Sequence, residues 1–441
     1  MASAQPTTNG RTIDGLKPRG AYEEATLGFR EYWWPVCVSG EISTTPKAFM
    51  LLGDPVAILR RAGKAYAIKD ECPHRGTEFS MINTRKNWEF PGTCTITCPY
   101  HGWTFDVSNG RCVAVISEGP ESPVPNSGVR VKTYPVEERL GLIWIWMGQT
   151  APVPVDEDIP NLLLDPKAVV KAFYRVKWGN WRFHAENVAA GHAGMVHKST
   201  FRNWFGKGNL AAAAPPEAEY FEDADGKGII TLYGQGGPDA TRMPSAGNRM
   251  PPRPSGPPEF PGVGVWHLKP RWQRTLLGWF PGSRSGFGRP VQGIQGMMLM
   301  LPGLFRVPNF PNIGYMYYEW YVPVDEENYI YFQIMAFWPK NWLARIRWEL
   351  KYYFWDRPTG PVLFNNQDAA MVAQTTKYYK RTGNLRYLTK VSKNDELDVI
   401  WRKYCDEEAR VVGSNYGQQS EPAAEAVPEA ALASPVVASG G

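Results

Sequence analysis

Hydrophobic and polar residues alternate with a period of two through much of the first third of the chain, as expected for half-buried strands. The clearest cases are two strand pairs that flank glycine turns: Val56–Arg60 with Ala65–Lys69, and Thr104–Val107 with Cys112–Ile116. Glycine in such short connections is typical of β-hairpins, because it accepts the backbone angles of a tight turn. An apolar run at Leu142–Met147 ends the series. We therefore predict a small antiparallel β domain in this region.

The second half of the chain combines strands with helices. Tyr315–Val324 and Tyr329–Trp338 are joined by four polar residues, which predicts a long antiparallel hairpin. Trp181 to His197 fits a helix better than a strand, and another helix is expected after Asn341, whose side chain suits an N-cap. Prolines between 152 and 166 separate this part from the β domain. The predicted fold class is α+β: an all-β domain followed by an antiparallel sheet with helices.

Composition narrows the functional classes. The chain has 441 residues with 43% hydrophobic and 21% charged residues, which suits a globular protein of two or three domains. The net charge of +5 is spread along the sequence, so we expect no nucleic-acid partner. No apolar run approaches the roughly 20 residues of a membrane span, and the first twenty residues hold no apolar signal core. We expect a cytoplasmic protein without a membrane anchor.

Cysteine and histidine are paired at two places in the β domain. Cys72 and His74 form a Cys-x-His pair, and Cys98 and His101 form a Cys-x-x-His pair, each beside a glycine. Zinc sites usually pair like ligands, which makes zinc the less favoured alternative. One cysteine and one histidine from each loop suit a [2Fe-2S] cluster in which one iron takes both thiolates and the other both imidazoles. Cys94 lies between the loops and is expected to be a free thiol rather than a competing ligand.

A second histidine pair lies in the other half of the chain. His192 and His197 are five residues apart, so that both can face one metal from a slightly distorted helix. Two histidines and one carboxylate on one face of iron(II) leave positions open for dioxygen and substrate. By itself the pair is weak evidence, because surface and core histidines are commoner. His184 is expected to be a core or supporting residue, and His267 a surface or packing residue.

With both clusters in place, the chain resembles the terminal oxygenase (alpha) component of the Rieske non-haem iron oxygenases, most closely the carbazole dioxygenase type. The resemblance spans roughly residues 25–415 and rests on these segments: Leu27-Gly-Phe-Arg30, Asn180-Trp-Arg182, Glu186-Asn187, His197-Lys-Ser199, Glu319–Asp325 and Phe364–Asp368. It implies a Rieske [2Fe-2S] domain (25–150) and a mononuclear iron catalytic domain of the helix-grip type (151–415). The composition of the two ends predicts a loose leader (1–24) and a disordered tail (416–441).

The resemblance also implies residue roles. Cys72, His74, Cys98 and His101 would hold the Rieske cluster, and His192, His197 and Asp368 the mononuclear iron(II). The family places an aspartate shortly before the first iron-binding histidine, where it bridges to the Rieske histidine of a neighbouring subunit. Here the region reads Val188-Ala-Ala-Gly191, without an acid. Glu186 and Asn187 are the candidate replacements, because both side chains can hydrogen-bond an imidazole.

The resemblance implies partners and a reaction as well. Electrons would come from a ferredoxin and an NAD(P)H-dependent reductase, and a head-to-tail homotrimer would bring the Rieske cluster of one subunit near the iron of the next. The enzyme would use O2 to dioxygenate or monooxygenate a hydrophobic substrate, aromatic or polycyclic in character. An O- or N-demethylase is the alternative within the family. A non-oxygenating Rieske redox protein with a decayed iron site is the alternative of another class, favoured by the missing acid.

Overall fold

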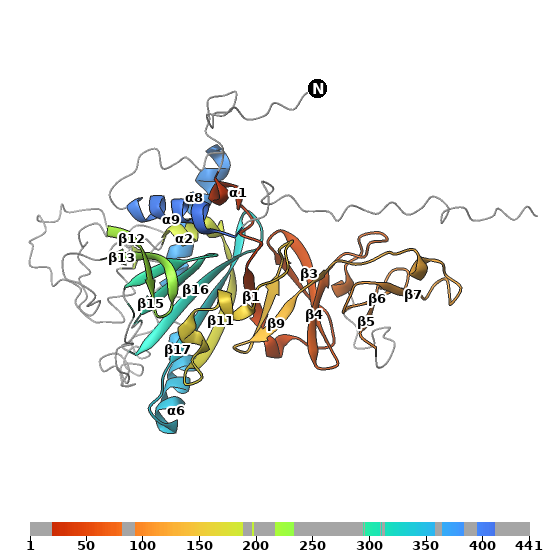
Figure 1. Cartoon of the computed structure of the whole chain (residues 1–441), viewed down its shortest axis with the longest axis horizontal. Helices are drawn as coiled ribbons and strands as arrows, with labels where there is room; N and C mark the ends of the chain where they lie inside the picture. The colour runs from red at the N-terminus through yellow and green to blue at the C-terminus, as the bar shows by residue number, and fades with distance from the viewer. Residues whose placement is uncertain are drawn as a thin grey trace, which may run out of the picture. The chain divides into compact units, whose positions relative to one another are not determined.

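The computed structural model describes residues 20–81, 93–187, 196–197, 217–232, 294, 296–308, 310, 314–357, 364–382 and 395–410 (Figure 1). His192 and His267 lie outside these residues. The chain divides into two compact units. One is Arg30–Val155, and the other combines residues 20–29 with the described residues of Asp156–Tyr416. The boundaries expected from the sequence, at 25 and 150, lie slightly before these.

The unit Arg30–Val155 is built from three small antiparallel sheets. Their strand orders are β1 (Trp33–Val38), β10 (Leu142–Trp146), β9 (Val136–Arg139); β2 (Lys47–Leu51), β3 (Asp54–Arg61), β4 (Lys64–Lys69), β8 (Thr133–Tyr134); and β5 (Thr95–Thr97), β6 (Trp103–Asp106), β7 (Cys112–Val115). Both predicted hairpins are confirmed, as β3–β4 and β6–β7. Ala62 and Gly63 both have positive φ, as a two-residue hairpin turn requires.

The second unit is organised around one seven-stranded antiparallel sheet. Its strand order is β11 (Val169–Trp178), β17 (Asn328–Phe337), β16 (Tyr315–Pro323), β15 (Leu304–Pro308), β14 (Met297–Met300), β13 (Gly226–Leu232), β12 (Glu217–Asp223). The predicted long hairpin is confirmed as β16–β17, which is buried along almost its whole length. The fold is therefore α+β, with an all-β unit and a unit in which helices accompany an antiparallel sheet.

Helices pack at two ends of this sheet (Figure 1). α1 (Ala21–Glu24), α2 (Trp181–Asn187), α8 (Asn365–Thr382) and α9 (Glu396–Glu408) gather at one end, and α6 (Trp342–Lys351) lies at the other. The Asn341 side chain accepts a hydrogen bond from the Ala344 amide at 2.9 Å, so the predicted N-cap of α6 is confirmed. The predicted helix begins at Trp181, as α2, and α2 is described as far as Asn187. Residues 188–195 of the predicted helix lie outside the described residues.

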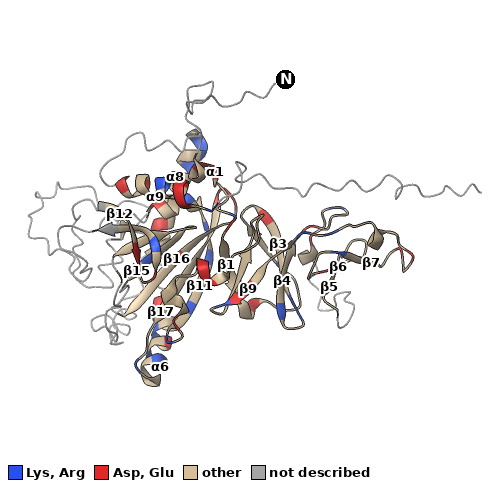
Figure 2. Cartoon of the chain, in the orientation of Figure 1, with Lys and Arg blue, Asp and Glu red and all other residues tan. Residues whose placement is uncertain are grey.

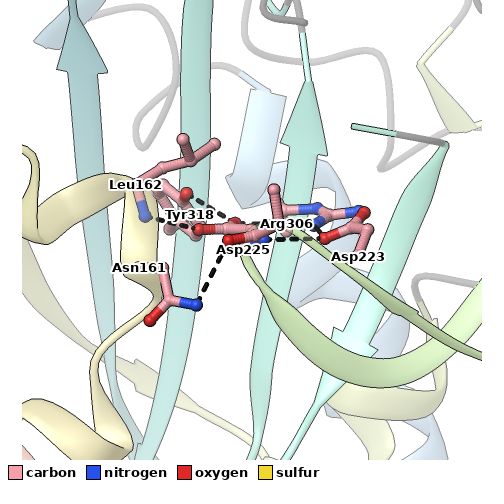
Figure 3. A network of polar contacts seen from close by, with 7 residues as sticks. Asn161, Leu162, Asp223, Asp225, Arg306 and Tyr318 are labelled. Atoms are coloured by element: carbon pink, nitrogen blue, oxygen red, sulfur yellow. Dashed lines mark hydrogen bonds and ion pairs between the residues drawn. The ribbon is translucent and has the colours of Figure 1, made fainter. Parts of the chain in front are cut away.

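A buried ionic network fixes the β12–β13 hairpin to the rest of the sheet (Figure 3). The Arg306 guanidinium donates to both carboxylate oxygens of Asp223, at 2.8 and 2.7 Å. Asp225, in the hairpin turn, accepts from the Tyr318 hydroxyl at 2.7 Å and from the Leu162 amide at 2.9 Å. The network therefore joins the hairpin to β15, to β16 and to the segment before β11.

Charges of both signs are interspersed along the described elements (Figure 2). Among these elements, no helix is both long and apolar enough to cross a lipid bilayer.

Candidate metal centres

Two loops of the all-β unit share one local fold. The carbonyl of Cys72 accepts from the Gly76 amide at 2.8 Å, and the carbonyl of Cys98 accepts from the Gly102 amide at 3.1 Å. Both glycines have φ near +70°, a left-handed conformation that glycine adopts without strain. A side chain on Gly102 would also collide with Ile116, at 2.8 Å. Each cysteine thus begins a tight turn that a glycine ends, and the histidine lies inside the turn.

The two cysteines of these loops contact one another, and so do the two histidines. The Cys72 and Cys98 thiols are buried and hydrogen-bonded to one another, which lowers the pKa of Cys98 to about 6 and raises that of Cys72. The rings of His74 and His101 have centroids 4.7 Å apart. Nδ1 of His101 is buried and has no hydrogen-bond partner among the described residues. Paired thiols and an unsatisfied imidazole nitrogen fit a cluster held by two cysteines and two histidines.

Neighbouring aromatic rings hold the two imidazoles in place. Trp103 stacks on His74 with ring centroids 4.6 Å apart, and the ring centroids of Tyr100 and His101 are 3.7 Å apart. Burial and the nearby His101 lower the pKa of His74, which keeps its imidazole in the neutral form that binds metals. The thiol of Cys94 instead meets the Tyr66 hydroxyl, in keeping with a free thiol.

The second site lies where His197 and the end of α2 meet the start of α8. Nε2 of His197 lies 3.0 Å from Oδ1 of Asp368, and Nδ1 of the same ring lies 3.0 Å from Oε1 of Gln367. The Asn187 amide donates to Asp368 at 3.0 Å. Burial lowers the pKa of His197, but the charge and hydrogen bond of Asp368 outweigh this, so the pKa is raised overall. Two of the three predicted iron ligands, His197 and Asp368, are therefore adjacent, and His192 lies outside the described residues.

Two stretches of the chain match known protein families. The model of the Rieske [2Fe-2S] domain matches residues 32–135, and that of the homotrimeric ring hydroxylases matches residues 275–413. The terminal oxygenase component of carbazole 1,9a-dioxygenase from Sphingomonas sp is 33% identical over 326 residues, which is 71% of this chain and 75% of that protein. This chain belongs to the Rieske ring-hydroxylating oxygenases.

Two further relatives are similar to this chain over most of its length. The terminal oxygenase component of carbazole 1,9a-dioxygenase from Metapseudomonas resinovorans is 28% identical over 90% of this chain and 94% of its own. A solved structure of a carbazole-bound oxygenase in complex with the ferredoxin of carbazole 1,9a-dioxygenase superposes with a TM-score of 0.67 at 27% identity, covering 88% of this chain and 91% of that one. The family carries a Rieske [2Fe-2S] cluster and a mononuclear iron site in the catalytic domain, and the donor atoms described above suit both groups.

The two candidates for the missing aspartate have different surroundings in this oxygenase. Asn187 contacts Asp368, as described above. Glu186 points elsewhere: its Oε1 accepts from the Tyr22 hydroxyl at 2.9 Å and from Nε of Arg402 at 2.7 Å. Glu186 thus joins α1, α2 and α9, whereas Asn187 contacts a predicted iron ligand.

An aromatic wall of Phe364 and Phe310 lies beside His197 and packs against the core residue Tyr317. Phe364 stacks on the His197 ring with centroids 3.8 Å apart. The ring centroid of Phe310 lies 5.4 Å from that of Phe364 and 5.3 Å from that of Tyr317. Most other aromatic residues of β16 and β17 serve the core, for example Tyr315 and Phe337, which pack on Trp348.

Several residues of this site were not assigned from the sequence. Gln367 precedes the predicted ligand, but nothing in its position marks it as the partner of a histidine 170 residues away. Lys177 is buried on β11, and its ammonium group donates to the Asn366 side chain beside Asp368. His184 is a buried supporting residue, as predicted: Nδ1 meets the Tyr329 hydroxyl at 2.5 Å, and Nε2 meets the Asn365 amide at 3.1 Å.

Proposed function

We propose that this protein is the terminal oxygenase of a multicomponent system that hydroxylates planar polycyclic aromatic compounds, including nitrogen heterocycles of the carbazole type. The observation that carries the proposal is the buried His197–Asp368 pair beside an aromatic wall, in a chain that also has a Rieske cysteine–histidine set. The similarity to carbazole 1,9a-dioxygenase supports this choice of substrate class. We propose the domains 25–150 for the Rieske cluster and 151–415 for the iron.

The protein's own groups have defined tasks in this proposal. Cys72, Cys98, His74 and His101 hold the Rieske cluster, and His192, His197 and Asp368 hold the iron. When bound, the cluster supplies single electrons and the iron activates dioxygen. Oε1 of Gln367 accepts from Nδ1–H of His197, which directs Nε2 toward the metal. The Asn187 amide orients the Asp368 carboxylate through its hydrogen bond.

The aromatic wall binds the substrate and keeps water away. Phe364 and Phe310 place aromatic rings next to a proposed iron ligand, and planar substrates pack favourably against such rings. Dioxygenation of an aromatic substrate consumes one O2, two electrons and two protons and yields a dihydrodiol. The electrons and protons must therefore reach a site from which bulk water is largely excluded.

The remaining partners follow from the relatives. We propose that a ferredoxin delivers the electrons, as in the oxygenase–ferredoxin complexes that this chain resembles, and that an NAD(P)H-dependent reductase supplies the ferredoxin. The similarity to homotrimeric ring hydroxylases supports a homotrimer. A cytoplasmic location would give this system access to NAD(P)H.

The test is turnover with isotopically labelled dioxygen. Purified protein, ferredoxin and reductase would be incubated with carbazole or fluorene under ¹⁸O₂, and the products analysed by mass spectrometry. Two labelled oxygens in one product support dioxygenation, and one supports monooxygenation. Formaldehyde release from methoxy- or N-methyl-substituted rings, without ring hydroxylation, would favour the demethylase. An Asp368→Ala variant is the negative control. No oxygen incorporation by protein with both metal centres loaded would contradict the proposal.

A further inference from the structure

Large apolar side chains are exposed along one helix of the catalytic unit. The helix is α6, together with the π-helix Tyr352–Asp356 that continues it. Single exposed apolar residues are common on protein surfaces, but a contiguous group of them usually marks a binding surface. We call this group the α6 stripe. Its members are between 46 and 72% exposed: Trp342, Leu343, Ile346, Leu350, Tyr353 and Phe354.

The spacing of these residues places them along one side of the helix. Trp342, Ile346 and Leu350 follow one another at intervals of four, which brings their side chains one above the next. Tyr353 and Phe354 continue the series by one more turn. At about 1.5 Å per residue, the stripe from Trp342 to Phe354 is roughly 18 Å long. It is therefore a narrow, continuous apolar surface.

The opposite side of α6 is fixed to the sheet. Trp348 is 2% exposed and stacks on Phe337 of β17, with ring centroids 5.4 Å apart. Tyr352 is buried next to Trp348. Nζ of Lys351 donates to Oδ1 of the buried Asp356 at 2.7 Å. The helix cannot turn the stripe toward the sheet without losing these contacts, so the stripe stays on the outside of the unit.

Cationic side chains border the stripe. Neighbouring residues of a helix are about 100° apart, so Arg345 and Arg347 lie on opposite sides of Ile346. Both arginines are exposed. Residues 340–357 include five cationic and two acidic side chains, a net charge of +3 (Figure 2). Both acidic side chains already have a cationic partner in this chain. The margins of the stripe are thus complementary to an anionic surface.

An anionic lipid leaflet matches this combination. Helices that lie in the membrane interface have an apolar side bordered by lysine or arginine, and tryptophan and tyrosine favour the level of the headgroups. The stripe has aliphatic side chains at its centre, Trp342 at one end, and Tyr353 and Phe354 at the other. A protein partner would need an apolar groove with acidic groups along both sides. A leaflet presents phosphates around any inserted side chain.

We propose that the α6 stripe docks this oxygenase on an anionic lipid surface, with α6 lying in the plane of the headgroups. Such a contact is peripheral and needs no membrane-spanning segment. It goes beyond the proposed function, to which it adds a source of substrate. Planar polycyclic compounds dissolve far better in acyl chains than in water. An oxygenase held at the bilayer therefore meets such compounds where they are concentrated.

Sedimentation with vesicles tests the docking without turnover. The full-length holoprotein should bind vesicles of phosphatidylcholine and phosphatidylglycerol more tightly than vesicles of phosphatidylcholine alone, and rising salt should weaken the binding. Ile346→Asp and Phe354→Asp should each lower the partition coefficient about tenfold or more, because an anion replaces an inserted apolar side chain. Arg347→Gln should lower it about fivefold, and only with the anionic vesicles.

A matched control is available on another helix of the same unit. Val399 on α9 is also a half-exposed apolar residue, so Val399→Asp should bind anionic vesicles as the wild type does. Lipids with brominated acyl chains show which residues insert. They should quench tryptophan fluorescence more in the wild type than in Trp342→Phe, which keeps the stripe apolar but removes its indole. Because all of these variants change exposed residues, their thermal stability should match that of the wild type.

Each other outcome overturns the proposal. The wild-type holoprotein could bind neither kind of vesicle, or bind both no better than Ile346→Asp does. A lower native mass of Ile346→Asp in light scattering would make the stripe a contact between copies of this chain. Weaker ferredoxin binding by Ile346→Asp in the absence of lipid would make it a site for a protein partner.

The proposed function is tested separately from the docking. With substrate dissolved in detergent micelles, Ile346→Asp should incorporate labelled oxygen at the wild-type rate, because the stripe lies on the side of α6 away from the sheet. A wild-type protein that incorporates no oxygen would contradict the proposed function, whereas vesicle binding and its loss in Ile346→Asp would still decide the docking.

Discussion

At the scale of single residues, neighbours in the sequence have different tasks because their side chains leave α2 in different directions. Asn187 reaches Asp368 on α8, whereas Glu186 reaches Arg402 on α9 and Tyr22 on α1. The first contact involves a proposed iron ligand, and the second concerns the packing of three helices. Substitutions at the two positions should therefore affect different properties.

This difference gives a paired prediction. Asn187→Ala should weaken iron binding about tenfold, the usual effect of losing a hydrogen bond to a metal ligand, with little change in stability. Glu186→Gln should lower the free energy of unfolding by about 2 to 3 kcal/mol and leave iron binding unchanged, because Arg402 loses its buried partner. Iron titration of the metal-free protein and denaturant unfolding measure the two effects. A stable Glu186→Gln variant that cannot bind iron would reverse the assignment.

Cys98 and Cys94 should respond differently to substitution by serine. Cys98→Ser should abolish the visible absorption and the electron paramagnetic resonance signal of a Rieske cluster, because Cys98 is one of its proposed thiolate ligands. Cys94→Ser should keep both signals, because the Cys94 thiol meets Tyr66. Loss of the cluster in Cys94→Ser, with Cys98→Ser retaining it, would show that the ligand set is different.

At the scale of elements, a few buried polar contacts set how the β-sheet of the catalytic unit is held together. Side chains of Arg306, Asp223 and Asp225 are almost fully buried, with exposed fractions of 0, 4 and 0%. Burial raises the pKa of Asp225, and the charge of Arg306 acts in the opposite direction. The β12–β13 hairpin therefore depends on a cation that comes from β15.

Arg306→Ala should destabilise this hairpin strongly. The change leaves two buried carboxylates without their cation, for which a loss of about 3 to 5 kcal/mol is typical. Hydrogen exchange should then speed up in Glu217–Asp223 and Gly226–Leu232 before the rest of the sheet, and thermal unfolding should occur at lower temperature. Arg345→Ala is the control: it removes an exposed ion pair with Glu349 and should cost less than about 0.5 kcal/mol. Equal losses in both variants would contradict a special role for the buried network.

At the scale of the whole molecule, each chain carries both metal centres, but the proposed homotrimer allows electrons to pass between chains. The similarity to homotrimeric ring hydroxylases includes residues 275–413, which contain β16, β17 and the Asp368 helix. In a head-to-tail trimer, the Rieske cluster of one subunit serves the iron of the next. The two centres of one chain then need not work together.

Subunit mixing tests this arrangement. Cys98→Ser protein lacks a proposed Rieske ligand and Asp368→Ala protein lacks a proposed iron ligand, so each alone should be inactive. Trimers reassembled from both should regain part of the activity, because an intact cluster in one subunit then lies next to an intact iron site in another. The native mass, measured by light scattering, should be three times the chain mass of 49.6 kDa. Trimeric mixtures that remain inactive would show that electrons stay within one chain.

Local features were predictable from the sequence, because neighbouring residues decide them. The Cys-x-His and Cys-x-x-His spacings indicated the cluster loops, glycine turns indicated β3–β4 and β6–β7, and the position of Asn341 indicated the start of α6. The ligand role of Asp368 came from family resemblance, since one aspartate among many carries no local signal. The sequence also left Glu186 and Asn187 equivalent, because nothing local says which way each side chain points.

The sequence alone therefore determined the α+β class and the cysteine–histidine pattern of the first metal centre, because turn geometry and ligand spacing act over a few residues. Only the tertiary structure decided which distant side chains meet. Asn187 and Asp368 are 181 positions apart, and His197 and Gln367 are 170 apart. The contact between the Glu319 carboxyl group and the Tyr331 hydroxyl likewise depends on the register of β16 and β17. Such partnerships arise from the packing of whole elements and have no counterpart in local sequence.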